Sequence, residues 1–193
     1  MARPLANFLL CLPLVLLAIL WLPGCAENDD DPTNPKVSVL AKKLGSQISS
    51  LRELVLEPLA NNDSRAAEEV LANFFMKAAA AGKPIENGIL ILNAQGVTFA
   101  ERHPAPGHPD GVPGSSSAKD YSSYQMVRQA LQKGRIELGV VYLDQDKLYV
   151  VCCPLGKRTP VGVLVLGILG SDLEARIGVS GQEFLKMDIA PDS

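Results

Sequence analysis

The 193-residue sequence predicts an α+β fold in which helices cover a five-stranded antiparallel sheet. The strand signal consists of five short apolar runs bounded by turn-forming residues, at 88–93, 97–100, 139–143, 148–153 and 161–169. The helix signal is strongest over 37–59, where apolar residues recur every three or four positions. Because the last three runs are apolar almost without interruption, both faces of the sheet must be covered.

The N-terminal segment reads as an export signal. Arg3 precedes the apolar residues 8–22, which have the length of a signal-peptide core and are short for a membrane span. The run ends in Leu22-Pro23-Gly24-Cys25, which resembles the lipobox of bacterial lipoproteins. That resemblance implies cleavage before Cys25 and attachment of diacylglycerol to its thiol, so that lipid holds the protein on a membrane. The alternative is an uncleaved N-terminal anchor with an incidental cysteine.

These features predict three parts of the chain: a lipoprotein signal peptide at 1–24, an acidic flexible tether at 25–36, and a single domain at 37–193. The tether holds four acidic residues and two prolines within 26–35, a composition that cannot pack a core. The net charge of -3 argues against nucleic-acid binding, because no stripe of lysine and arginine is present to neutralise phosphates.

The cysteines indicate neither a cofactor nor a metal. The four of them occupy positions 11, 25, 152 and 153, a spacing that matches no zinc site, redox pair or haem attachment. Cys152 and Cys153 are neighbours on one predicted strand and therefore point to opposite faces. A bond between them would strain extended backbone, so two buried reduced thiols are favoured over a disulfide.

The long helix predicted over 37–59 carries one apolar stripe and ends at Pro58. The stripe consists of residues at steps of three or four: Leu40, Leu44, Ile48, Leu51 and Val55. It is interpreted as the cover of the sheet. The alternative is that part of it pairs with a second copy of the chain, since near-heptad spacing would allow a homodimer through this helix.

A second helix is predicted to begin at Asp63 or Ser64 and to end near Gly82. The segment 101–119 is rich in proline and glycine and is predicted to be a long loop. It contains both histidines of the chain, His103 and His108, which are interpreted as solvent-exposed loop residues in preference to metal ligands.

A third helix is predicted to follow with Asp120 as its N-cap and Gly134 at its end. Tyr121, Tyr124 and Arg128 project from nearly one side of it, an aromatic and cationic cluster that suits the wall of a ligand pocket. The alternative is that both tyrosines belong to the core and the arginine is solvated.

The order of elements, together with three short motifs, resembles the Cache domain, a PAS-like extracytoplasmic sensing module of bacterial receptors. The motifs are Asn93-Ala94-Gln95-Gly96, Asp120-Tyr121-Ser122, and Pro154-Leu155 followed by Val161-Gly162-Val163-Leu164. The resemblance covers residues 37–173. It implies that a small-molecule ligand lies between the sheet and the loop and helix that cross it. Tyr124 stands where amino-acid-binding relatives carry an arginine.

This resemblance also indicates which residues line a pocket. The candidate ligand-binding residues are Arg102, Tyr121, Tyr124, Arg128, Tyr142 and Tyr149. Tyr142 and Tyr149 flank a hairpin turn, and the sequence does not assign the side of the sheet that holds the pocket.

The sequence therefore predicts a lipid-anchored sensory module of the bacterial cell envelope, facing the periplasm or the exterior, that binds a small molecule and passes its state to a separate signalling protein. The alternative is a lipoprotein that uses a PAS-like fold only as a protein-docking surface. An enzyme is not expected, because no nucleophile–base pair, catalytic carboxylate pair or phosphate loop is recognisable.

Overall fold

A long helix opens the described part of the chain. The computed structural model describes residues 34–82, 85–114, 117–156 and 158–190, so the predicted signal peptide, Cys25 and most of the tether lie outside the described residues. Helix α2 (Pro35–Ala60) begins after Asn34, whose side chain accepts a hydrogen bond from the Lys36 amide. It was predicted to end at Pro58, but it continues to Ala60. Among the described residues, no helix is both long enough and apolar enough to cross a membrane.

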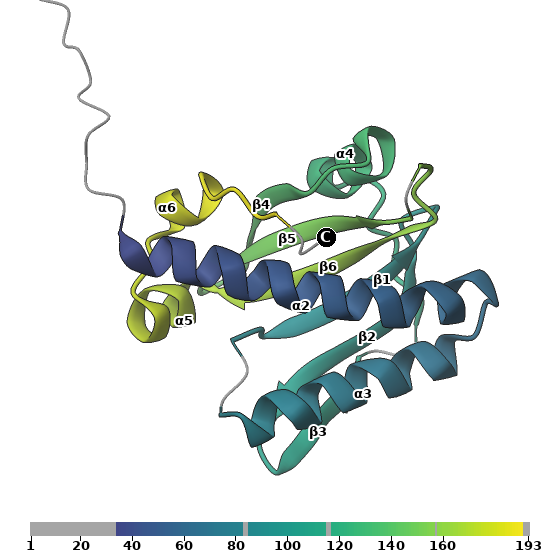
Figure 1. Cartoon of the computed structure of the whole chain (residues 1–193), viewed down its shortest axis with the longest axis horizontal. Coiled ribbons are helices and arrows are strands. Elements are labelled where there is room, and N and C mark those ends of the chain that lie inside the picture. The colour runs from purple at the N-terminus through teal and green to yellow at the C-terminus, as the bar shows by residue number, and fades with distance from the viewer. Residues whose placement is uncertain (1–33, 83–84, 115–116, 157, 191–193) are drawn as a thin grey trace, which may run out of the picture. The chain divides into compact units, whose positions relative to one another are not determined.

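The sheet has six antiparallel strands, one more than predicted, and the α+β class is confirmed. The strands are β1 (Gly88–Asn93), β2 (Thr98–Ala105), β3 (His108–Pro113), β4 (Glu137–Tyr142), β5 (Lys147–Leu155) and β6 (Gly162–Leu169). Their order across the sheet is β3-β2-β1-β6-β5-β4, so the last strand in sequence lies beside the first at the centre (Figure 1).

The sixth strand lies in the segment 101–119, where a long loop was predicted; that prediction is wrong. β2 continues to Ala105, and β3 pairs with it through a turn at Gly107, where φ is +78°. β3 contains Pro109 and ends at Pro113, residues that ordinarily argue against a strand. An edge strand tolerates them because one side of its backbone needs no partner.

Two helices cover one face of the sheet, side by side in Figure 1. α2 packs on β5 and β6, while α3 (Ser64–Ala80) packs on β2 and β3. The Asp63 side chain caps α3 by accepting a hydrogen bond from the Ala66 amide, as predicted. The whole apolar stripe of α2 is buried in the core on this face, which confirms its interpretation as the cover of the sheet.

The third helix covers the opposite face but begins later than predicted. α4 (Gln125–Lys133) follows Tyr124 as its N-cap and ends at Gly134 in the left-handed conformation. Asp120 is therefore not the N-cap. It forms a β-bridge with Val97, and its carboxylate accepts a hydrogen bond from the Ser122 amide at 2.8 Å. Hydrogen bonds from Ser122 hold the pKa of Asp120 below its ordinary value.

Strand β5 separates two cores. Val151 and Cys153 lie in the core beneath α2 and α3, whereas Val150 and Cys152 lie in the smaller core beneath α4. This alternation follows from the period of two along a strand. Both cysteines are free and buried, in agreement with the expected reduced thiols on opposite faces.

The chain after β6 closes the core beneath α2. It forms α5 (Gly170–Asp172), a π-helical turn η2 (Leu173–Ile177) and α6 (Gly181–Leu185), the last opened by a capping box between Ser180 and Glu183. Phe184 of α6 is fully buried and packs against Tyr149, with 5.4 Å between ring centroids. The C-terminal segment is thus part of the fold's core.

Candidate ligand-binding cavity

A cavity of about 270 Å³ lies between the sheet and α4, on the face opposite α2. Its floor comes from β1, β5 and β6, its roof from α4 and the turn before it, and its two ends from β2 and β4. The lining residues are Leu90, Leu92, Glu101, His103, Tyr121, Tyr124, Met126, Val127, Val141, Leu143, Leu148, Val150, Cys152 and Val165. Most are apolar, as is usual for sites that bind small organic molecules.

The roof approaches β4 closely because that strand carries a glycine there. A Cβ atom at Gly139 would overlap the terminal methyl of Met126. The absence of a side chain lets Met126 reach down toward the sheet, while Val127 of the same helix is buried against it. Met126 therefore packs tightly over Gly139 at one edge of the cavity.

The polar end of the cavity is formed by two side chains of β2. Glu101 and His103 are two residues apart and so share a face of the strand. Nε2 of His103 lies 2.8 Å from Oε1 of Glu101, and Nδ1 lies 3.4 Å from the carbonyl oxygen of Asn87. The carboxylate and imidazole hold each other in place, and only 6% of the Glu101 side chain is exposed.

Glycines make room for both of these groups. A Cβ atom at Gly88 would lie 2.7 Å from Nδ1 of His103, and one at Gly114 would overlap the Glu101 side chain. Nζ of Lys119 lies 3.7 Å from Oε2 of Glu101. The polar end therefore has one buried acid, one half-buried imidazole and one lysine at its rim.

Two tyrosines form the roof next to this acid. The rings of Tyr121 and Tyr124 are 5.8 Å apart and tilted by 45°. Burial raises the pKa of the Tyr121 hydroxyl above its ordinary value, and the negative charge of Glu101 and the neighbouring Tyr124 add to that effect. Tyr121 thus lies within electrostatic reach of the carboxylate.

The structure brings together two of the six predicted pocket residues. Tyr121 and Tyr124 line the cavity, whereas Arg128 is exposed on α4 and Tyr142, 74% exposed, lies at the outer end of β4.

Tyr149 and Arg102 do not line this cavity. Tyr149 is buried beneath α2, because β5 turns alternate residues to opposite faces. Arg102 alternates with Glu101 and His103 along β2, and its Nε donates a hydrogen bond to the Asp110 carbonyl at 3.0 Å. Its guanidinium also lies 3.5 Å from the Asp110 carboxylate, so its partner comes from β3.

Glu101 and His103 were not identified as pocket residues from the sequence. The available signal was the Glu-Arg-His alternation directly after the run 97–100, which places acid and imidazole on one face if the strand continues. Ending the predicted strand at Ala100 concealed it. His103 is accordingly half-buried in β2, and its predicted place in an exposed loop is wrong, whereas His108 is exposed at the start of β3.

The Cys152 thiol on the cavity floor is expected to be unreactive. Burial raises the pKa of Cys152 to about 12, with smaller contributions from Cys153 and Glu137. A thiol that stays protonated is a poor nucleophile. Within the described ranges, no group of three histidine, cysteine, aspartate or glutamate side chains is placed to hold a metal ion.

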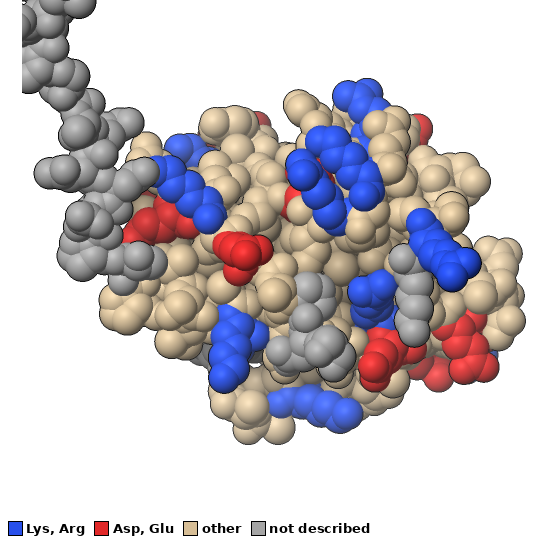
Figure 2. All heavy atoms as spheres, turned by 45° about the horizontal axis from the view of Figure 1, so that its top comes forward, with Lys and Arg blue, Asp and Glu red and all other residues tan. Residues whose placement is uncertain are grey.

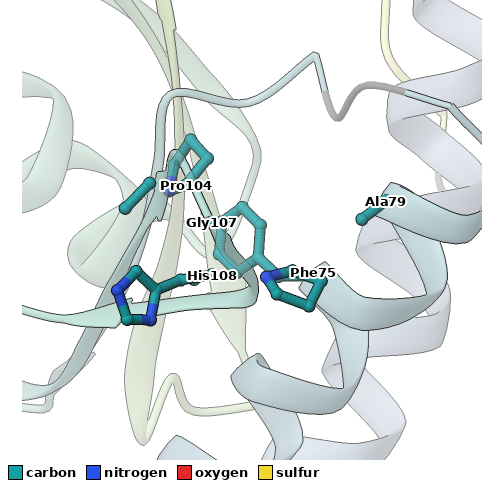
Figure 3. A pocket seen from close by; sticks show the side chains of 8 residues that line it. Phe75, Ala79, Pro104, Gly107 and His108 are labelled. Carbon is teal, nitrogen blue, oxygen red and sulfur yellow. The ribbon is translucent and has the colours of Figure 1, made fainter.

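A second hollow, of about 310 Å³, lies between α3 and the turn of the β2–β3 hairpin. Figure 3 shows Phe75 and Ala79 on the helix facing Pro104, Gly107 and His108 on the hairpin. It is more open to solvent than the cavity beneath α4 and lacks a buried charged group among its lining residues. The less open cavity beneath α4 is therefore the better candidate for specific recognition.

The surface charge near α4 is mixed. Figure 2 shows lysine and arginine side chains gathered toward α4, with acidic side chains among them. Arg135, for example, lies 2.8 Å from Glu137, and Lys133 lies 3.9 Å from the same carboxylate. Pairing of this kind is typical of a solvated protein surface.

Comparison with known proteins identifies the fold. No protein-family model and no curated protein matches the sequence. Among solved structures, the extracellular domain of a protein described as the histidine kinase vpHK1S-Z8 matches with a TM-score of 0.56 and 14% identity, over 77% of this chain and 59% of that chain. A domain of a protein described as a sensory box/GGDEF family member from Vibrio parahaemolyticus matches with a TM-score of 0.53 and 16% identity, over 77% and 62%.

The fold is PAS-like. At these identities the likeness concerns the fold, and the chain spans about three-fifths of the length of the two matched structures. The predicted PAS-like α+β architecture is confirmed, with α2 on one face of the sheet and the cavity on the other.

Proposed function

We propose that this protein is a lipid-anchored extracytoplasmic sensory module that binds a small molecule beneath α4 and passes its state to a separate partner protein. The observation that carries the proposal is the apolar cavity of about 270 Å³ with a single polar end, in a PAS-like fold. The names of the two matched proteins, a histidine kinase and a sensory box/GGDEF protein, agree with a sensory role.

A ligand in this cavity would contact both the sheet and the α4 segment. Tyr121 and Tyr124 precede α4, and Met126 and Val127 belong to it, so one bound molecule would contact both the turn before α4 and the helix itself. A ligand shifts an equilibrium only by its difference in affinity between two states. We propose that the position of α4 over the sheet is what differs and that the partner recognises it.

Membrane attachment is proposed through diacylglycerol on Cys25, on the cell-envelope side that faces the periplasm or the exterior. The support is the lipobox resemblance of Leu22-Pro23-Gly24-Cys25 and the acidic tether that follows. Metabolic labelling with radioactive palmitate should mark the wild-type protein, and Cys25→Ser should remove the label. Equal labelling of both proteins would contradict the proposal.

A protein-docking lipoprotein is less well supported. That alternative predicts a filled interior beneath α4, whereas the cavity is present. A homodimer through α2 remains a proposal. Because the apolar stripe of α2 is buried in the core, such a contact would use the outward face, where Val39 and Leu54 are exposed. We further propose that the module is not an enzyme.

Thermal denaturation in the presence of a metabolite collection tests ligand binding. A ligand at one hundred times its Kd stabilises by about 2.7 kcal/mol, which raises Tm by roughly 5–11 °C for a domain of this size. Val165→Phe on the cavity floor should abolish the shift, and the same substitution at the exposed Val161 should preserve it. A folded protein that no metabolite stabilises would contradict the proposal.

A further inference from the structure

Glu101 is a buried acid with unused hydrogen-bonding capacity. Its side chain is 6% exposed, Oε1 lies 2.8 Å from Nε2 of His103, and Oε2 is buried and accepts no hydrogen bond from the described residues. Removing a carboxylate from water is costly unless a donor or cation compensates it. One oxygen of this acid, whose side chain lines the polar end of the cavity, therefore lacks a hydrogen-bond donor within the described part of the chain.

Lys119 compensates this oxygen only weakly. Its Nζ lies 3.7 Å from Oε2, beyond hydrogen-bonding distance, and its side chain is 45% exposed. Only the lysine of this pair is exposed, and water screens its charge while holding it in place costs side-chain entropy, so it offsets the burial of the carboxylate only in part. A cation inside the cavity would be held in a drier place and could displace the lysine into solvent.

The roof favours the same kind of occupant. Tyr121 and Tyr124 present aromatic rings next to the carboxylate, and the faces of such rings attract cations. Among the described lining residues there is no lysine or arginine to pair with an anion. A carboxylate ligand would meet the negative charge of Glu101 directly, with no lysine or arginine in the described lining to offset the repulsion.

From this arrangement we infer that the cavity binds a small molecule with an apolar body and one ammonium head, with the head at the Glu101 carboxylate and beside the tyrosine rings. This names the ligand class of the proposed sensory function and rests on it. At about 30 Å³ per water molecule, the volume of about 270 Å³ corresponds to about nine water molecules. Primary amines with one short alkyl chain or one aromatic ring suit that space.

Isothermal titration calorimetry with matched probes tests the inference on the full chain. The amines are hexylamine and 2-phenylethylamine, and the controls are 1-hexanol, 2-phenylethanol and 3-phenylpropionate. We expect each amine to bind at least about tenfold more tightly than the matched alcohol, because hydrogen bonds to charged groups are worth that much or more. The carboxylate should bind more weakly than the alcohol.

Three variants separate the head-group contact from general effects. Glu101→Gln should weaken amine binding at least about tenfold and change alcohol binding less than about threefold, since only the charge is lost. Glu137→Gln, a glutamate outside the cavity lining, should change neither. Lys119→Gln changes an exposed side chain and should leave the fold intact. It should tighten amine binding, because it removes a competing cation.

The outcomes distinguish the two levels of the proposal. Tighter binding of the alcohol or the carboxylate, or amine binding that Glu101→Gln leaves unchanged, would overturn the ligand class while the cavity remains a binding site. If Glu101→Gln does not fold, weaker amine binding in Lys119→Gln would overturn it instead. No binding by any probe, together with no stabilisation by any metabolite, would overturn both the ligand class and the sensory function.

Discussion

Two neighbouring valines on β5 offer a direct test of the cavity. Val150 lines the hollow beneath α4, whereas Val151 is fully buried in the packed core beneath α2. The substitution Val→Ala removes the same atoms at adjacent positions of one strand. Any difference in its cost must therefore come from what surrounds each side chain.

The magnitude follows from transfer and cavity costs. Each substitution removes two methyl groups, worth about 0.8 kcal/mol each, so the lost transfer free energy is about 1.6 kcal/mol at either site. At Val151 the surrounding core also gains a void, which brings the expected loss to about 2–3 kcal/mol. At Val150 the removed atoms already bordered a hollow, so the loss should stay at about 1–1.5 kcal/mol.

Urea denaturation followed by circular dichroism measures both losses, and unchanged m-values would confirm that the unfolded states are comparable. In thermal scans the larger loss should lower Tm by roughly 4–12 °C. Ligand stabilisation should change in Val150→Ala and persist in Val151→Ala. An equal cost at the two sites, or a greater cost at Val150, would refute the assignment of a hollow and a packed face to β5.

Three further predictions concern buried groups. Burial raises the pKa of Glu86 above its ordinary value of 4.5, so the folded state holds this proton more tightly and stability falls as pH rises from 4.5 through the folded-state pKa. Glu86→Gln should therefore be more stable than wild type at pH 8 and lose that advantage at pH 4, as urea denaturation at both pH values would show. Burial raises the pKa of Cys152 to about 12 and of Cys153 to about 11, so iodoacetamide at pH 8 should label their peptide only after unfolding, as mass spectrometry would reveal. Phe184→Ala should lose about 3–5 kcal/mol in the same denaturation assay, yet leave ligand affinity unchanged, because Phe184 packs on Tyr149 on the face away from the cavity.

Local patterns in the chain predicted most helices and strands. The spacing of Leu40, Leu44 and Ile48 defines a face of α2 whatever it packs against, because the helical repeat of 3.6 residues is a property of the backbone. The opposite directions of Cys152 and Cys153 follow in the same way from the strand repeat of two. Asp63 caps α3 through a contact within one turn of chain.

Features that depend on distant partners were not predicted. β3 contains Pro109 and Gly111, and it is a strand only because β2 lies beside it at the edge of the sheet. Asp120 has the sequence signature of a helix cap, but Val97 and Ser122 provide the partners that it uses. Residues of low strand propensity adopt strand geometry when a neighbouring strand supplies the hydrogen bonds.

By itself, the sequence determined the α+β class, the two-sided covering of the sheet and the opposite faces of the two adjacent cysteines, because each depends on a repeat along the chain. The PAS-like architecture was expected from a resemblance in the order of elements and three short motifs. Tertiary structure alone decided which side of the sheet holds the cavity and which residues line it. Glu101 and His103 at its polar end lie beside Tyr121 only after the sheet folds beneath α4, and no local repeat relates positions so far apart in the chain.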